Sequence, residues 1–314
     1  MFPLLTSHVE VFNISDNRNL CLAKKRRMNE FYTQLIDIKK ELKHYKNHFV
    51  NKTVFCNCND SEESNFWKYF SLNFDKLKLK KLITTGFINS KMDDSHKEKS
   101  SYRLEMYRDE NGLHTNKKAL KQNGDFRSPE CVELLKEADI VITNPPFSLF
   151  REYVAQLMEY NKQFLIIGNK NAITYKEIFP LLKNNDIWLG YENVKEFKQP
   201  DGTIKKFGNI GWFTNLDISK KHEDIILYRT YNTTDYPKYD NYDAINVNKV
   251  SEIPMDYSGI MGVPITFMDK YNPEQFRVIG LDKQFTSDGG RGKLNGKSKY
   301  ARILIKKMSD YVEN

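Results

Sequence analysis

The sequence has few of the features that mark secreted or membrane proteins. It contains four cysteines among 314 residues, too few for a disulfide scaffold in a chain of this length. Its apolar runs, such as residues 164–167, are far shorter than the roughly 20 residues of a membrane-spanning helix. No basic stretch followed by an apolar one opens the sequence, so we expect no signal peptide. These absences predict a cytoplasmic protein without a membrane partner.

Residue patterns typical of metal centres are missing as well. Cys56 and Cys58 lie two residues apart, but no nearby Cys or His pair completes a zinc-binding set. His44 and His48 have i, i+4 spacing, yet His48 falls beyond the end of the helix expected there. No Ser, His and Asp combination typical of a hydrolase is apparent. We therefore expect no metal centre.

The charge balance favours a polyanionic partner. Lysine and arginine number 49 against 41 aspartates and glutamates, a net charge of +8, although many proteins are basic without binding a polyanion. Aromatic residues make up 13% of the sequence, too many for a disordered chain. Residues 1–28 contain the basic run 24–27, and we interpret them as a tail, either solvated or phosphate-binding.

Strand-type and helix-type patterns alternate between residues 29 and 219. Apolar runs predict strands at 53–56, 81–87, 139–143, 163–168 and 186–191. Helical spacing predicts helices at 31–45, from 64 onward, and at 130–137, 150–160 and 175–183. This alternation predicts an α/β fold with a mostly parallel sheet covered on both faces. Because ligands bind at the carboxyl ends of such strands, we expect the chemistry after Cys56, Phe87 and Thr143.

Two further segments depart from this alternation. Residues 88–123 are highly polar and are predicted to form a strand with a loop insertion outside the core. From about residue 220 the helical spacing fades, and tyrosines crowd among Asn and Asp in residues 228–242. Prolines and glycines then punctuate short apolar runs. We interpret residues 220–314 as a less regular appended module.

The sharpest motif is Asn144-Pro145-Pro146-Phe147, directly after a predicted buried strand. An amino group conjugated to a ring is a poor nucleophile, and it improves when acceptors hold both of its hydrogens. The Asn144 side-chain oxygen and the Pro145 carbonyl suit that role, and the two prolines fix the backbone that carries them. Phe147 offers a face for ring stacking. A tight turn at the strand end is the alternative interpretation.

This motif is similar to that of amino-group methyltransferases, and the chain as a whole resembles the EcoRI-type DNA adenine-N6 methyltransferases. The resemblance covers about residues 29–307. It is carried by residues 30–34, 55–60, 64–70, 124–128, 143–150, 164–167, 173–177, 236–249, 261–267, 272–276 and 302–306. One departure is that the segment between Tyr191 and Gly211 is short for the family, so the sequence specificity of the family is not carried over.

The resemblance implies a fold and an activity. The fold is a Rossmann-like S-adenosylmethionine-dependent methyltransferase core, residues 29–219, with a target-recognition module in residues 220–314. The activity is site-specific methyl transfer from S-adenosylmethionine to N6 of an adenine flipped out of duplex DNA, leaving S-adenosylhomocysteine. The expected setting is a restriction-modification system, in which a monomeric enzyme works beside a possible cognate endonuclease that acts on the same site.

The resemblance also implies donor-binding residues. Tyr32, Thr33 and Gln34, preceded by Phe31, match the opening of a first helix that holds the methionine end of the donor; an ordinary helical turn is the alternative. Residues Cys56, Asn57 and Asp60 belong to a loop that replaces the usual glycine-rich one. Asp125, next to Phe126, suits an acceptor for the donor's adenine, or is a simple turn residue.

Stacking and DNA contacts follow from the same resemblance. Phe147 is expected on one face of the target base and Trp212 or Phe213 on the other, unless these two are core residues of a late strand. The residues expected to contact DNA are Tyr239, Asn241, Lys249, Arg291, Lys297 and Arg302. A folded module with solvated charges is the alternative interpretation of that region.

Two other classes of protein compete with this one. A protein-glutamine methyltransferase also uses Asn-Pro-Pro-aromatic, but it would be expected to keep a glycine-rich donor loop and to lack the C-terminal module. A non-catalytic DNA-binding relic of the fold would have no use for a complete amino-group clamp at residues 144–147.

Overall fold

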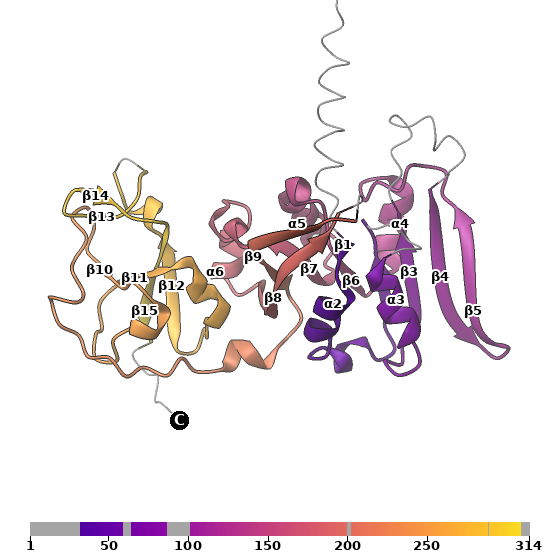
Figure 1. Ribbon diagram of the computed structural model, residues 1–314, viewed down its shortest axis with the longest axis horizontal. Coiled ribbons are helices and arrows are strands. Elements are labelled where there is room, and N and C mark those ends of the chain that lie inside the picture. The colour runs from indigo at the N-terminus through magenta and orange to yellow at the C-terminus, as the bar shows by residue number, and fades with distance from the viewer. Residues whose placement is uncertain (1–31, 59–63, 87–100, 200–201, 288, 309–314) are drawn as a thin grey trace, which may run out of the picture.

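The computed structural model describes residues 32–58, 64–86, 101–199, 202–287 and 289–308. A nine-stranded sheet forms its larger part, and a four-stranded sheet lies beside it (Figure 1). The basic run 24–27 falls outside the described residues.

Four parallel strands form the centre of the large sheet, in the order β7-β6-β2-β3. Their bounds are β2 (Thr53–Cys56), β3 (Lys81–Thr85), β6 (Ile140–Thr143) and β7 (Gln163–Asn169). They match the unbroken apolar runs of the sequence. Such runs are typical of strands whose two faces are both covered.

Both edges of the large sheet are antiparallel, so the expectation of a mostly parallel sheet is wrong. One edge continues through β4 (Tyr102–Asp109) and β5 (Gly112–Ala119), and the other through β9 (Ile204–Thr214), β8 (Trp188–Lys198) and β1 (Tyr32–Thr33). Short turns join β4 to β5 and β8 to β9, and a short turn can join only antiparallel strands. The polar segment 88–123 thus provides a two-stranded hairpin where we expected one strand.

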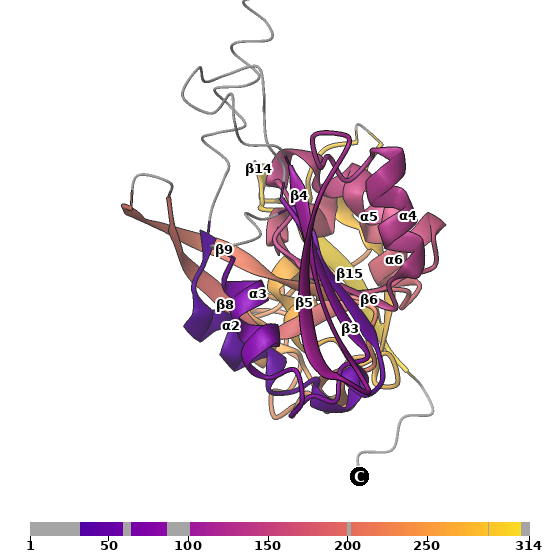
Figure 2. The same cartoon turned by 90° about the vertical axis from the view of Figure 1, so that its right-hand side faces the viewer.

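Helices cover both faces of the central strands (Figure 2). One face carries α2 (Leu35–Leu42) and α3 (Asn65–Leu72); the other carries α4 (Pro129–Glu137), α5 (Phe150–Glu159) and α6 (Phe179–Lys183). Val54 packs into the cluster under α2 and α3, and its neighbour Phe55 into the cluster under α4 and α5. The alternation of strand side chains thus divides the core into two layers.

The start of the first helix differs from the prediction. Tyr32 and Thr33 do not form a helical turn but a short strand that pairs with Lys198 and Phe197 of β8. Gln34 is the N-cap residue, and helix α2 begins at Leu35. An aromatic residue followed by a β-branched one favours the strand, which explains the shift.

The C-terminal sheet has the order β10-β11-β15-β12. Its strands are β10 (Ile245–Asn246), β11 (Met261–Pro264), β12 (Phe276–Leu281) and β15 (Arg302–Lys307). A separate hairpin joins β13 (Lys293–Leu294) to β14 (Lys297–Ser298). Its turn is Asn295-Gly296, with φ of 51° and 72°. Asn-Gly is the pair that tolerates two successive left-handed residues in such a turn.

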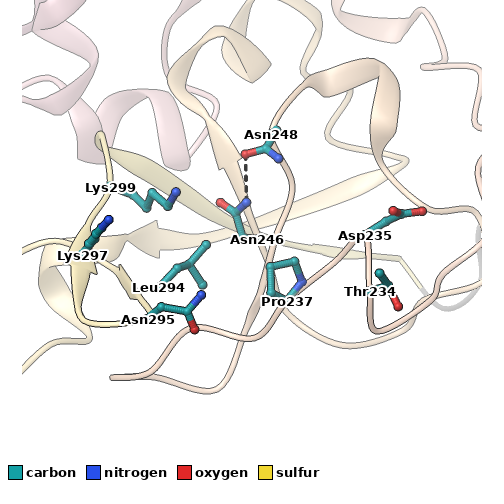
Figure 3. Close-up of a pocket in the computed structure, with 9 residues that line it drawn as sticks. All are labelled: Thr234, Asp235, Pro237, Asn246, Asn248, Leu294, Asn295, Lys297 and Lys299. Atoms are coloured by element: carbon teal, nitrogen blue, oxygen red, sulfur yellow. Dashed lines mark hydrogen bonds between the residues drawn. The ribbon is translucent and has the colours of Figure 1, made fainter.

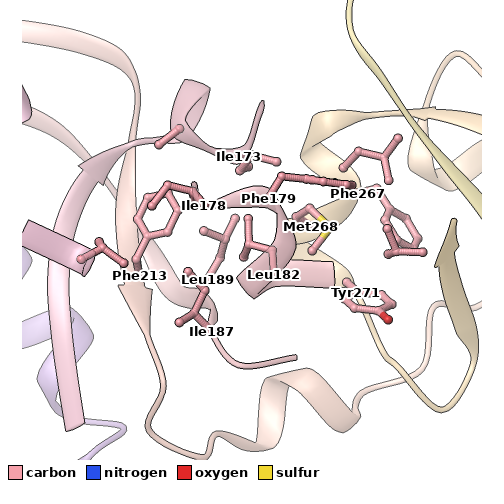
Figure 4. Close-up of a cluster of buried hydrophobic side chains, with 14 of the residues drawn as sticks. Ile173, Ile178, Phe179, Leu182, Ile187, Leu189, Phe213, Phe267, Met268 and Tyr271 are labelled. Carbon is pink, nitrogen blue, oxygen red and sulfur yellow. The ribbon is translucent and has the colours of Figure 1, made fainter. Parts of the chain in front are cut away.

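One apolar cluster runs continuously between the two sheets. Ile178, Phe179 and Leu182 at α6 belong to the same buried cluster as Phe267 and Met268 of the 3₁₀ turn Ile265–Lys270 (Figure 4). Beside it, the buried Lys170 ammonium lies 2.5 Å from the Asp269 carboxylate. The C-terminal part is therefore packed onto the large sheet. No helix within the described ranges is long and apolar enough to cross a membrane.

Candidate active site

The site forms where the carboxyl ends of β2 and β6 meet. Val54 and Phe55 of β2 pair with Ile140 and Val141 of β6, so the loops after these two strands emerge side by side. From β2 the chain crosses to β3 on one side, whereas β6 and then β7 lie on the other. In open α/β sheets, a crevice that binds ligands opens at such a reversal of strand order.

Hydrogen bonds hold Asn57 between the two strand ends. The Thr143 hydroxyl donates to the Asn57 backbone carbonyl, and the Tyr153 hydroxyl from α5 donates to the Asn57 side-chain oxygen. Asn57 itself is buried, with 2% of its surface exposed. Burial raises the pKa of Tyr153 well above its ordinary value, so its hydroxyl keeps the proton that it donates. No local motif marks Tyr153, which lies within the amphipathic helix α5.

The loop after β2 adopts a glycine-like backbone without glycine. Cys58 has φ of 64°, in the left-handed region that non-glycine residues seldom occupy. Cys58 thus has the left-handed backbone conformation that a glycine usually provides in a donor-binding loop. Such strained residues persist where the surroundings hold them in place, and they cluster at ligand sites. Asp60, two residues on, lies outside the described residues.

A second loop reaches the same place from the turn before α4. Gly124 has φ of 74°, a left-handed conformation that suits glycine, and it turns the chain into Asp125 and Phe126. The Phe126 ring packs edge-on against Tyr153, with centroids 5.0 Å apart. Arg127 donates to both carboxylate oxygens of Asp125, at 2.8 and 2.7 Å. The structure thus brings Phe126 next to the residue that holds Asn57, and it fixes Asp125 with a bidentate partner.

The residues after β6 form a rigid segment. Asn144 is buried, with 8% of its surface exposed, and directly follows a strand that is paired on both sides. Pro146 has φ of −56° and ψ of 124°, an extended conformation, and it caps the 3₁₀ turn Phe147–Leu149. Residues 144–146 therefore belong to neither the strand nor the turn, which begins only at Phe147.

Phe147 lies in an aromatic cluster built with the hairpin β8–β9. Its ring meets Phe197 edge-on at 6.2 Å and Phe207 edge-on at 6.3 Å, and these two rings lie 5.5 Å apart. Phe197 is fully buried, whereas Phe147 and Phe207 are half-buried. Sequence reasoning missed Phe207, because it looked for the second aromatic residue nearer the end of β9.

Trp212 and Phe213 lie in the core, a position that does not suit the expectation that one of them stacks on the target base. They are 1% and 0% exposed, because β9 is paired on both sides by β7 and β8. Phe213 packs against Phe150, and Trp212 packs against Phe66. Both are core residues of a late strand, the alternative that the sequence left open.

The strand β1 brings a polar side chain to the rim of this cluster. Thr33 pairs with Phe197, which contacts Phe147, and its backbone carbonyl accepts a hydrogen bond of 2.8 Å from the Asn65 amide. The Thr33 hydroxyl is buried and has no hydrogen-bond partner among the described residues. A buried polar atom of this kind fits a polar ligand group. Phe31, which precedes it, lies outside the described residues.

The residues expected to contact DNA fall into two groups. Tyr239 and Arg302 are buried at 5% and 8% exposure and hydrogen-bond to Asn246, so they do not offer a free surface. Asn241 is likewise occupied: it accepts from the Lys293 backbone and donates to the Arg291 carbonyl. The second group comprises Lys249, Arg291 and Lys297, whose side chains reach solvent; Lys249 also pairs with Glu252, and Arg291 with Asp282.

One cysteine, Cys56, lies at the end of β2 beside the site. Burial raises the pKa of the Cys56 thiol, which leaves it protonated and unreactive near neutral pH. Within the described residues, no group of three His, Cys, Asp or Glu side chains could hold a metal ion.

The chain is similar to three curated type II methyltransferases over nearly its whole length. It is 48% identical to M.EcoRI of Escherichia coli, covering 92% of this chain and 96% of that protein. It is 40% identical to M.MgeORF184P of Mycoplasma genitalium and 38% identical to M.MpnI of Mycoplasma pneumoniae, covering 98% of each. The model of a family described as adenine-specific methyltransferase EcoRI matches residues 19–308. No solved structure matches the chain.

A mixed α/β sheet with an Asn-Pro-Pro-Phe motif at the end of a central strand defines a methyltransferase that acts on amino groups. The family match and the identities narrow this further: the chain belongs to the EcoRI family of adenine-specific methyltransferases. It is therefore an enzyme, a DNA adenine methyltransferase of the kind found in restriction-modification systems. Neither a protein-glutamine methyltransferase nor a non-catalytic relic is favoured by these comparisons.

Proposed function

We propose that the crevice between β2 and β6 binds S-adenosylmethionine and methylates N6 of an adenine flipped out of duplex DNA at a defined sequence. The observation that carries this proposal is the placement of Asn144, Pro145 and Pro146 beside Asn57, where the strand order reverses. We accordingly interpret residues 29–219 as a Rossmann-like methyltransferase core and residues 220–314 as its target-recognition module.

The residues at the strand ends fit the donor. When bound, S-adenosylmethionine supplies an activated methyl group, which is carried on a sulfonium. The buried Thr33 hydroxyl, with Tyr32 and Gln34 beside it, would bind the polar methionine end. Asn57 and Cys56 would line the middle of the donor, and Phe126 its adenine ring. Asp125 accepts three hydrogen bonds from Arg127, which hold its carboxylate in place, and we propose that this carboxylate accepts from the adenine amino group of the donor.

Asn144 and Pro145 prepare the amino group of the target. Their two oxygens would accept hydrogen bonds from the N6 amino group. These hydrogen bonds favour a pyramidal N6, whose lone pair is no longer conjugated with the ring. The strand before Asn144, which is paired on both sides, and the two prolines after it would fix both acceptors before the base arrives. Preorganised acceptors of this kind need no rearrangement at the moment of reaction, so they lower the barrier. The chain then has only to hold donor and acceptor in line.

Phe147 and Phe207 are the pair proposed to hold the flipped base. Both rings are half-buried and meet edge-on, one from the loop after β6 and one from β9, so a base would have to part them or stack on their exposed faces. Lys205, whose ammonium lies 5.4 Å from the centre of the Phe207 ring, is exposed beside them and suits a phosphate contact. The half-buried position allows a base to enter where the fully buried Trp212 and Phe213 do not.

Duplex DNA is the proposed partner of the C-terminal module. Exposed Lys249, Lys297 and the half-exposed Arg291 offer cations to the phosphates. We propose that one copy acts on one strand at a time, as a monomer, and that the basic residues 1–28 form a tail. A cognate endonuclease acting on the same site would complete a restriction-modification pair.

Transfer of labelled methyl groups to plasmid DNA tests the activity. After digestion to nucleosides, the label is expected in N6-methyl-2′-deoxyadenosine, and sequencing should place the modified adenines within one short sequence. Label in another base, or in protein, would contradict the proposal. Label scattered over adenines without a common sequence would contradict its site-specific part.

A further inference from the structure

A pocket of about 490 Å³ lies in the C-terminal module, away from the crevice between β2 and β6 (Figure 3). One wall holds Thr234 and Asp235, and the opposite wall holds the hairpin residues Lys297 and Lys299. Asn246 and Asn248 lie between these walls, joined by a hydrogen bond of 2.9 Å. The pocket is therefore lined by amides, with lysines along one side.

A relay of hydrogen bonds fixes the orientation of the two amides. The Asn246 oxygen accepts from the Tyr239 hydroxyl at 2.7 Å and faces the Arg302 guanidinium at 3.5 Å. Because its oxygen is held by these donors, the Asn246 amide nitrogen must point the other way, and it donates to the Asn248 oxygen. Asn246 is 2% exposed, whereas Asn248 is exposed. Three buried side chains thus set the direction of one exposed amide.

The exposed amide offers a donor and an acceptor side by side. Among the described residues, the Asn248 side chain makes one hydrogen bond, which its oxygen accepts from the Asn246 amide. Its NH₂ group and the second lone pair of its oxygen therefore face the pocket. Adenine presents the complementary pair, an N7 acceptor and an N6 donor, along its major-groove edge, and asparagine binds that edge through two hydrogen bonds.

We propose that Asn248 is a specificity-determining residue that reads an adenine in the recognition sequence, other than the adenine that is methylated. Tyr239, Asn246 and Arg302 are its positioning residues, which explains why a tyrosine and an arginine are buried in a module that binds DNA. The proposal rests on the proposed function, since it presumes a duplex seated on this module.

The charges and the position of the pocket suit a duplex. Lys297 and Lys299 are exposed on the rim, where they can contact phosphates while the amides meet a base edge. Asp235 on the far wall would repel a phosphate there, which favours one direction of approach. In Figure 1 the hairpin β13–β14 lies on the same upper side of the molecule as the start of β4, and Arg103 in β4 pairs with Thr85 at the carboxyl end of β3. The hairpin β13–β14 and the carboxyl end of β3 thus lie on the same side of the molecule.

Selection of duplexes from a randomised pool by the full-length protein tests the proposal. Base preferences are read from the bound fraction by sequencing, and methyl transfer is measured separately. Asn248→Ala is expected to lose about tenfold to a hundredfold of the preference for adenine at one position, while preferences elsewhere persist. Lys297→Ala is expected to weaken binding to all sequences alike and to reduce the slope of log affinity against log salt by about 0.9.

The matched control is Asn184→Ala, which removes an exposed amide at the end of α6 and should change no preference. Base preferences that stay unchanged at every position in Asn248→Ala would overturn the proposal. Tyr239→Phe, which removes one bond of the relay, should give a weaker loss at the same position. If base selection depends on Asn248 but wild-type protein transfers no methyl group, the proposed function fails and this inference stands.

Discussion

Replacing Asn144 by alanine removes one of the two acceptors proposed for the amino group of the target adenine. The Pro145 carbonyl stays in place, because β6 is paired on both sides and Pro146 fixes the chain beyond it. Asn144 is 8% exposed, so the gap left by its amide is not open to bulk water. The local backbone therefore has little freedom to restore the lost contact.

The size of the effect follows from comparable sites. Loss of one preorganised hydrogen-bonding group costs about 2.7–4 kcal/mol of transition-state stabilisation, which corresponds to roughly a hundredfold to thousandfold fall in rate. The contact strengthens as the amino nitrogen pyramidalises, so the loss should appear in the turnover rate rather than in DNA affinity. Asn144→Asp keeps an acceptor oxygen at the same reach and should lose less than Asn144→Ala.

Single-turnover transfer from labelled donor, with enzyme in excess over DNA, measures the chemical step directly. DNA affinity and melting temperature are measured beside it, and Asn184→Ala serves as the control for loss of an exposed amide. A single-turnover rate for Asn144→Ala within threefold of wild type, in a folded protein that binds DNA normally, would refute the role of Asn144.

Three further predictions concern other parts of the molecule. Phe207→Ala should weaken binding of the flipped base by about 1–3 kcal/mol, which would appear as a smaller rise in 2-aminopurine fluorescence at the target position. The control Leu72→Ala, which removes an exposed side chain on α3, should leave that signal unchanged. Asp269→Ala leaves the buried Lys170 ammonium without its carboxylate partner, so thermal or urea unfolding should show a loss of roughly 3 kcal/mol in the free energy of unfolding. A loss below 0.5 kcal/mol would contradict a stabilising role of this ion pair between the two sheets. Burial raises the pKa of Cys56, and the thiolate is the reactive form, so alkylation of Cys56 in folded protein should stay slow as the pH rises from 7 to 9. In unfolded protein, the alkylation rate measured by mass spectrometry should rise with pH. Rapid labelling of native Cys56 at pH 8 would contradict its burial.

The central strands could be predicted from sequence because burial on both faces leaves an unmistakable apolar run. Residues 53–56 and 163–168 are of this kind, and the structure confirms them. The edges could not be predicted as well. Strand β5 is exposed or half-buried throughout, and β4 is buried only over its middle residues, so their sequence shows a polar segment rather than a strand pair.

In the candidate site too, residues within a short motif could be predicted, whereas residues that only the fold brings together could not. Asn144 to Phe147 could be found because four adjacent residues carry the chemistry in order. Phe207 and Tyr153 could not, since each is brought to the site by strand pairing or helix packing and carries no local signature. Trp212 and Phe213 look equally suitable in sequence, and only the pairing of β9 on both sides shows that they are buried.

The same reasoning applies to the boundary near residue 220. The change in composition predicts two parts, but the apolar cluster of Phe179, Leu182, Phe267 and Met268 crosses between them. Deleting the C-terminal residues would expose the apolar face of α6. Point variants in the full-length chain are therefore the better probe of target recognition.

A crystal structure of the full-length protein with S-adenosylhomocysteine and a duplex carrying its recognition sequence would test the central claim most directly. The account predicts the target adenine out of the helix and in contact with Phe147 and Phe207, with its N6 within hydrogen-bonding distance of the Asn144 side-chain oxygen and the Pro145 carbonyl. The cofactor product should lie across the ends of β2 and β6. A target adenine bound elsewhere, or a cofactor outside that crevice, would contradict the account.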